Sequence, residues 1–331
     1  MTTPLQAAVP VEVLLNEFLT DIQARHVLPA TAHTYQLDIQ EYLTWLNACG
    51  IAPEYVNEEF LKRYYQHLNE HYATSTAHRK WCTMRRFYSS LNVRQHISHN
   101  PVATFPVPRP GETRPSPHLL PADMRHLVEI TNPDRTSDPR RTVKLLRDNL
   151  LLLLMMRQGL SIGETVQLDV GHVIWRAGSS VQAIQVRGRQ SKPRVVPLVE
   201  QTAEVLQRWL PARAMMAAAN EPALFISLHW GDAGHGAGGT RLTTRGVRGI
   251  VDHYLEAIGA KAPRVSSQAL RCSYGIWSMF GGADPREVAA DIGSKTAEQC
   301  RQVADHLKTR PADYLDFLEV AKPQEPDRHG R

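Results

Sequence analysis

A run of basic side chains near residue 80 has the types and the spacing that phosphate binding requires. Between Lys62 and Arg94 the sequence holds seven lysine or arginine residues against one glutamate. Four of these cations can share one face of a predicted helix with a hydroxyl and an imidazole. The face comprises Thr76, His78, Arg79, Lys80, Arg85 and Arg86. It can neutralise phosphates along a nucleic-acid groove, although a solvated helix face gives the same charge pattern.

Four helices with short connections are predicted to carry this face within residues 10–100. Apolar residues at helical spacing indicate a first helix that ends near Pro29. Thr31 is a candidate N-cap for the second helix, which ends at Gly50, and Asn57 begins the third. The fourth, from about residue 75, holds the basic residues. Together they predict a compact helical domain.

Length and composition limit the classes of protein to which this chain can belong. The chain has 331 residues, of which 42% are hydrophobic and 21% charged, as expected for two ordinary globular domains. A formal charge of +5 and a pI near 9.1 favour a polyanionic partner. The longest apolar run, residues 150–156, is too short to cross a bilayer and no leader pattern precedes it, so we expect a cytoplasmic protein without a membrane partner. The four cysteines are far apart and unpaired with histidine, so we expect buried thiols and neither metal nor cofactor.

A proline-rich connector at residues 101–120 leads to a second domain at residues 121–331. Repeated proline removes backbone donors and forbids helix, which predicts an extended linker. Two short strands, Val181–Val186 and Arg194–Leu198, form a predicted hairpin, and residues 224–226 suggest another strand. The glycine-rich stretch after them lacks the Lys-Ser/Thr of a phosphate loop and is expected to be a surface loop. Helices are predicted at residues 121–130, 145–158, around 205–210, at 241–258 and at 311–320.

Several blocks of the sequence resemble the tyrosine site-specific recombinases, the phage integrase and Xer-type family. They are ATAHTYQLDIQEYLTWL, STAHRKWCTMRRFYSSLNV with Asn100-Pro101, GLSIGETVQL, RGRQSKPR, and QALR followed by the Gly281-Gly282 and Ile292-Gly293 steps. The resemblance implies a mainly α protein of two domains: a four-helix SAM-like core-binding domain, and a mixed α+β catalytic-type domain with a small antiparallel sheet. It also implies that the second and fourth helices of the first domain face double-stranded DNA.

The positions that carry chemistry in this family are occupied by other residues here. They are Ser161 for the first catalytic arginine, Arg189 for the general-acid lysine, Gln268 for the first histidine, Ser294 for the second histidine or tryptophan, and Val303 or Ala304 for the tyrosine. Only Arg271 keeps the family residue. Arginine stays protonated at any workable pH, so Arg189 can bind phosphate but is a poor proton donor.

These departures predict a phosphate-binding site without catalysis. Arg189, Lys192, Arg194 and Arg271 would hold DNA phosphates and Gln268 would keep a neutral hydrogen bond, although an internal salt bridge is the alternative for Arg271.

The sequence thus predicts a non-enzymatic relative that clamps duplex DNA and assists an active tyrosine recombinase, for example in resolving transposon cointegrates. Self-association through the last helix is a further expectation from the resemblance. Two alternatives stay open. One is a divergent active recombinase that uses Tyr314, since Tyr274 is expected to be a core residue. The other is a transcriptional or architectural DNA-binding protein that has no recombinase partner.

Overall fold

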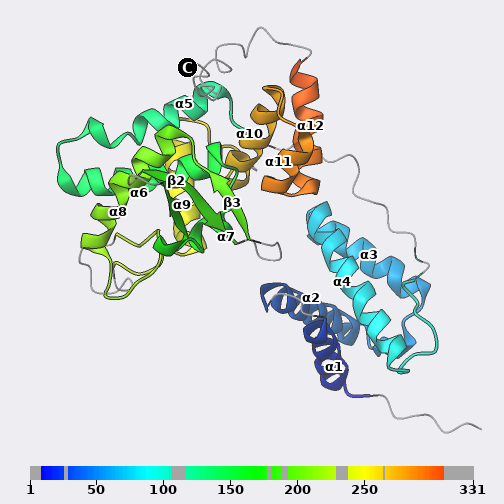
Figure 1. The fold of residues 1–331 in the computed structure, drawn as a ribbon. Helices are drawn as coiled ribbons and strands as arrows, with labels where there is room; N and C mark the ends of the chain where they lie inside the picture. The colour runs from blue at the N-terminus through cyan, green and yellow to red at the C-terminus, as the bar shows by residue number, and fades with distance from the viewer. Residues whose placement is uncertain are drawn as a thin grey trace, which may run out of the picture. The chain divides into compact units, whose positions relative to one another are not determined.

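The structure is a computed structural model, and it describes residues 9–25, 29–103, 105, 117–176, 180–187, 193–228, 238–263 and 265–308. The chain divides into two compact units, Met1–Thr113 and Arg114–Arg331 (Figure 1). Each unit has its own apolar core. The proline-rich residues 106–116, the glycine-rich residues 229–237 and the predicted last helix at 311–320 lie outside the described residues.

The described residues of the first unit form four helices around an aromatic core. They are α1 (Val11–Ala24), α2 (Pro29–Ala48), α3 (Glu58–His71) and α4 (Thr74–Val93), with a single 3₁₀ turn at Pro53–Tyr55 between α2 and α3. Tyr42 and Tyr88 meet in this core, and their hydroxyl groups are 2.7 Å apart. Since buried hydroxyls need partners, this hydrogen bond fixes α2 against α4.

Of the predicted helix starts, that of α3 is confirmed, whereas those of α2 and α4 lie at other residues than predicted. The Asn57 side chain accepts a hydrogen bond from the Phe60 amide and caps α3, as predicted. The second helix begins at Pro29, so Thr31 lies inside it and is not its cap. The fourth begins at Thr74 after Ala73, with no side-chain cap, because packing of its apolar face against the rest of the unit holds the helix.

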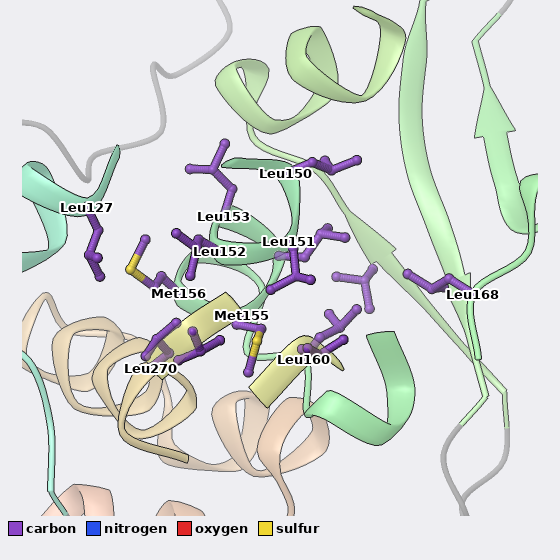
Figure 2. Packing of buried hydrophobic residues seen from close by; sticks show 14 of the residues in the cluster. Leu127, Leu150, Leu151, Leu152, Leu153, Met155, Met156, Leu160, Leu168 and Leu270 are labelled. Carbon is purple, nitrogen blue, oxygen red and sulfur yellow. The ribbon is translucent and has the colours of Figure 1, made fainter. Parts of the chain in front are cut away.

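The second unit is built around one buried helix, α6 (Pro139–Arg157). Asp138 caps it, and its residues from Leu145 to Met156 are all buried, as the apolar run predicts. Figure 2 shows leucines of α6 packed against residues of neighbouring segments such as Leu127, Leu168 and Leu270. The helices around it are α5 (Pro121–Ile130), α7 (Ile162–Val166), α8 (Glu200–Met216), α9 (Thr244–Ala257), α10 (Ser267–Phe280), α11 (Pro285–Ile292) and α12 (Ser294–Lys308), with 3₁₀ turns at Pro133–Arg135 and Val170–His172.

A three-stranded antiparallel sheet completes this unit in the order β1–β2–β3. The predicted hairpin is present as β2 (Val181–Val186) and β3 (Arg194–Pro197), and β1 (Val173–Trp175) was not predicted. Residues 224–226 do not form a strand: the isolated bridges here join Ala223 to Asp169 and Ile226 to Arg241. The register pairs Ile184 with Val196 and Val186 with Arg194. Alternation along β3 therefore turns Arg194 to the same face as the buried Val196.

Close packing joins the turn after α6 to α10 and α11. Gly159 has φ +66°, and a Cβ there would lie 2.5 Å from the Tyr274 ring. Only glycine fits such a left-handed and crowded position. As predicted, Cys272 and Cys300 are buried, whereas Cys49 and Cys82 are only half-buried. Within the described residues no helix is both long and apolar enough to cross a membrane.

Candidate nucleic-acid interface

The centre of the candidate site is one carboxylate that holds two arginines. Glu164 lies in α7 with 8% of its side chain exposed. Its Oε1 accepts from Arg194 of β3 at 2.6 Å, and its Oε2 accepts from Arg271 of α10 at 3.2 Å. Three elements far apart in the sequence therefore meet at this point, and each oxygen of the carboxylate serves one guanidinium.

Ser161 orients this carboxylate. Its backbone amide and its hydroxyl both donate to Glu164 Oε2, at 2.8 and 2.7 Å, while the hydroxyl accepts from the Glu164 amide. This reciprocal pattern is a capping box, which satisfies amide groups at the start of α7. The residue at the position of the family's first catalytic arginine thus holds the acidic centre of the cluster in place.

Arg271 stands in the first turns of α10, where the predicted motif places it. A second hydrogen bond, from its Nη2 to the Asp291 carbonyl oxygen, measures 3.2 Å. The side chain is 15% exposed. Arg271 thus does form the internal salt bridge that sequence reasoning left as the alternative, and it keeps part of its surface open.

Charge and burial act in opposite directions on these groups. Burial raises the pKa of Glu164, but hydrogen bonds from Arg194 and Ser161 and the charge of Arg271 outweigh it and hold the pKa below its usual value. Burial lowers the pKa of Arg271, and the nearby Glu164 opposes that shift. Since an arginine remains charged under such shifts, the cluster holds two cations around one anion.

Not all of the other site residues predicted in the second unit lie at the cluster of Glu164, Arg194 and Arg271. Gln268 is exposed, and its amide approaches the Cys272 sulfur at 3.6 Å. Val303 and Ala304 are buried on α12. Arg189, Lys192 and Tyr314 lie outside the described residues, and so does the side chain of Ser294. Their predicted roles stay predictions.

Two residues of the predicted basic face of α4, Arg79 and Lys80, form ion pairs with carboxylates of α2. Lys80 is 6% exposed and donates to Asp38 and Glu41 of α2, the latter at 2.6 Å. Arg79 also pairs with Asp38, whose side chain is 3% exposed. The buried charge of Lys80 holds the helices together and is not available to a phosphate, whereas Arg79 keeps 42% of its side chain exposed. The structure thus places Lys80 inside the unit, not on the face where the sequence predicts it.

The remaining members of that face differ in how much of their surface is exposed. Arg85 and Arg86 are exposed, with the Arg86 guanidinium 5.7 Å from the centre of the Tyr35 ring. Thr76 and His78 are half-buried, and His78 Nε2 lies 3.6 Å from the Cys82 sulfur. Arg85 and Arg86 thus have solvent-exposed side chains, as phosphate binding would require, and their predicted role stays a prediction.

The two described tyrosines of the second unit, Tyr254 and Tyr274, both form hydrogen bonds to carboxylates. Tyr274 donates to an oxygen of Asp291 at 2.5 Å, and Tyr254 donates to an oxygen of Asp148 at 2.9 Å. Burial and these carboxylates raise the pKa of both phenols above the usual value. Neither hydroxyl is suited to act as a nucleophile, because the phenolate form is disfavoured.

The chain thus combines a helical unit with a mixed unit in which two arginines bind one central glutamate. The sequence model of the "Phage integrase family" matches residues 119–306, and that of the "Phage integrase, N-terminal SAM-like domain" matches residues 15–95. The chain belongs to the phage integrase family. This confirms the predicted fold class and family.

The sequences of several tyrosine recombinases align with most of this chain. Tyrosine recombinase XerC of Pelotomaculum thermopropionicum is 28% identical over 295 residues, which is 85% of this chain and 89% of the relative. Tyrosine recombinase XerC of Herpetosiphon aurantiacus is 26% identical over 284 residues, covering 84% and 86%. Among solved structures, XerH recombinase bound to a palindromic difH substrate shares the fold with a TM-score of 0.67 at 15% identity, over 94% of this chain and 91% of that one.

The prediction that the chain is not an enzyme is wrong. The aligned relatives are named tyrosine recombinases, which are enzymes. That prediction rested on the departures from the family residues taken together, including the position of the nucleophilic tyrosine. In the structure Glu164 accepts hydrogen bonds from both Ser161 and Arg194. The predicted transposon setting and the separate active recombinase partner stay predictions.

Proposed function

We propose that this chain is a site-specific DNA recombinase that binds double-stranded DNA with both units and exchanges strands through a covalent intermediate. The observation that carries the proposal is the cluster of Arg194, Glu164 and Arg271 in a unit of the phage integrase family. Paired guanidinium groups match the oxygens of a phosphodiester and stabilise the charge of its pentacovalent transition state.

Tyr314 is the tyrosine that we propose as the nucleophile. The second unit contains three tyrosines, and two of them, Tyr254 and Tyr274, donate their hydroxyl groups to carboxylates. In the proposed step the phenol oxygen of Tyr314 bonds to phosphorus while the bond from phosphorus to the 5′ oxygen breaks. The products are a 3′-phosphotyrosine and a free 5′ hydroxyl, which takes up a proton.

A nicked duplex tests the proposal. The DNA is first selected from a random pool by binding to the full chain, and a nick near its centre then lets the free 5′ end diffuse away after cleavage. The wild-type chain should accumulate a covalent adduct, Tyr314→Phe should form none, and Tyr274→Phe should form as much as wild type. If the wild type forms no adduct, the enzyme proposal is rejected. An adduct that persists in Tyr314→Phe would place the nucleophile at another residue.

We also propose that the C-terminal residues 309–331 bind a second copy of the chain. A hollow of about 530 Å³ lies where α10, α11 and α12 meet, and it is lined by Met279, Gly282, Ala283, Asp284, Pro285, Arg301, Asp305 and Lys308. The C-terminal residues include Tyr314, Phe317 and Leu318 at helical spacing, which gives an apolar face that needs cover.

A further inference from the structure

Two histidines lie one turn apart near the end of α3, in the first unit. They are His67 and His71, and the centres of their rings are 4.3 Å apart. His67 is half-buried and His71 is exposed. Residues at positions i and i+4 of a helix share one face, and two histidines at this spacing can chelate a zinc ion. The spacing of the cysteines, on which the expectation of no metal rests, does not bear on this pair.

A hydrogen bond to the backbone prepares His71 to bind a cation. Its Nδ1 lies 2.9 Å from the carbonyl oxygen of His67. Since a carbonyl oxygen can only accept, Nδ1 carries the hydrogen, and the lone pair of the neutral ring is then on Nε2. Metal-binding histidines commonly donate their other ring nitrogen to a backbone carbonyl, because this bond fixes the tautomer and the orientation of the ring.

Aromatic packing orients the ring of His67. The Tyr64 ring lies nearly parallel to it, with the ring centres 6.2 Å apart, and the Trp45 ring of α2 lies 6.1 Å away. Tyr64 is 1% exposed, so it gives His67 a fixed surface to pack on. A side chain that is already held in one orientation loses little conformational entropy when it binds a ligand.

The electrostatic surroundings of the pair suit a divalent cation. Burial and the charge of His71 lower the pKa of His67. The carboxylates of Glu41 and Glu70 act in the opposite direction, and Lys80 adds a smaller lowering effect. Two imidazolium rings so close together repel each other, whereas the neutral imidazole is the form that binds a metal. The two nearby carboxylates can then balance the charge of an ion held by both rings.

We propose that His67 and His71 bind a divalent transition-metal ion such as Zn²⁺ through one nitrogen of each ring. Within the described residues no group of three or more histidine, cysteine or acidic side chains forms a metal site, so water completes the tetrahedral coordination of this ion. The ion joins two turns of α3 and stabilises the end of the helix, just before α4 begins at Thr74. The site is independent of the proposed recombinase activity.

Titration of the full chain with zinc chloride tests the site. Isothermal titration calorimetry should show a binding event that His67→Gln and His71→Gln each weaken by at least about tenfold, because each variant leaves a single imidazole. At a free Zn²⁺ concentration ten times the dissociation constant, amide hydrogen exchange at the end of α3 should slow by about tenfold in the wild type. The same amides should be unaffected by Zn²⁺ in both variants.

A matched variant keeps the number of histidines but changes their spacing. Asn69→His combined with His71→Gln places two imidazoles at positions i and i+2, which do not face each other on a helix. This double variant should bind Zn²⁺ as weakly as His71→Gln does. His126→Gln removes an exposed histidine of the second unit and should bind Zn²⁺ as the wild type does.

Two outcomes would overturn the proposal. One is equal Zn²⁺ affinity of the wild type and His71→Gln, and the other is wild-type affinity in the variant with the changed spacing. Since His71 is exposed, His71→Gln should unfold at the same temperature as the wild type when no metal is present. That variant therefore decides the matter even if the half-buried His67 does not tolerate substitution.

Discussion

Glu164 is the residue on which the site depends, because it joins α7, β3 and α10 through its side chain. Removing one member of a buried charge cluster costs more than the net value of the cluster, since the others remain buried and unpaired. Both arginines would be deprived of their shared acceptor.

Glu164→Gln should therefore lower the free energy of unfolding of the second unit by about 3 kcal/mol. Chemical denaturation of the full chain, followed by a probe in that unit, measures the change. Glu129→Gln is the matched control, because the exposed ion pair of Glu129 with Arg135 should contribute less than about 1 kcal/mol. Equal stability of the two variants would contradict the role assigned to Glu164.

The same carboxylate gives the second unit a pH dependence. Its pKa is lower in the folded chain than in the unfolded chain, so the unfolded state binds more protons. The contribution of Glu164 to stability is present above the unfolded value, near 4.5, and disappears as the pH falls through the folded value. Glu164→Gln should therefore flatten the loss of stability below pH 4.5.

Lys80 shows what residue-level prediction missed and which signal was available. The buried positions of α4 include Ala77, Lys80, Trp81 and Met84, which follow one another at helical spacing. Lys80 thus lies on the inward stripe, and Asp38 and Glu41 stand one turn apart on α2 to receive it. Charge alone suggested a surface cation, whereas periodicity together with the acidic pair predicts a buried one.

At the scale of elements, long helices could be predicted and short or non-local pieces could not. The twelve-residue buried run of α6 and the capped start of α3 have strong local signals. The strand β1 has only three residues, and its place is set by its pairing with β2. The meeting of Glu164 with Arg194 and Arg271 depends on sheet register and helix packing, which one sequence does not encode locally.

The helix α4 should bind DNA through its exposed cations. The double variant Arg85→Glu and Arg86→Glu should weaken duplex binding, and the slope of log affinity against log salt should fall by about 0.9 for each phosphate that no longer pairs with a cation. Salt titrations of binding to the selected duplex measure this. Lys62→Glu changes an exposed cation of α3 that pairs with Glu58 and should leave the slope unchanged. An unchanged slope in the double variant would remove α4 from the interface.

At the scale of the whole molecule, two variants test the assembly of copies. A chain that ends at Lys308 lacks the proposed docking segment, and Ala283→Trp fills the hollow that should receive it. Each should be monomeric alone, whereas an equimolar mixture should form a 1:1 complex, because one copy supplies the segment and the other the hollow. Sedimentation velocity with labelled duplex measures these states. Self-association of the truncated chain would contradict the proposal.

The connector between the units ends in a firm attachment to α10. The Leu119 amide donates to the Ser273 hydroxyl at 2.8 Å, and the Trp277 indole donates to the Leu119 carbonyl at 3.0 Å. On the other side Val102 is buried in the first unit. The ring of Phe105 also packs against that of Trp81, with the ring centres 4.9 Å apart. The tether from Phe105 to Leu119 has about 14 residues, so it spans at most about 50 Å.

Once one unit holds a duplex, the other therefore searches a volume limited by this tether. Its own binding step becomes intramolecular, with an effective concentration in the millimolar range for a tether of this kind. Two units that each bind DNA weakly can then bind it tightly together. Lengthening the tether would lower this combined affinity while leaving both binding surfaces unchanged.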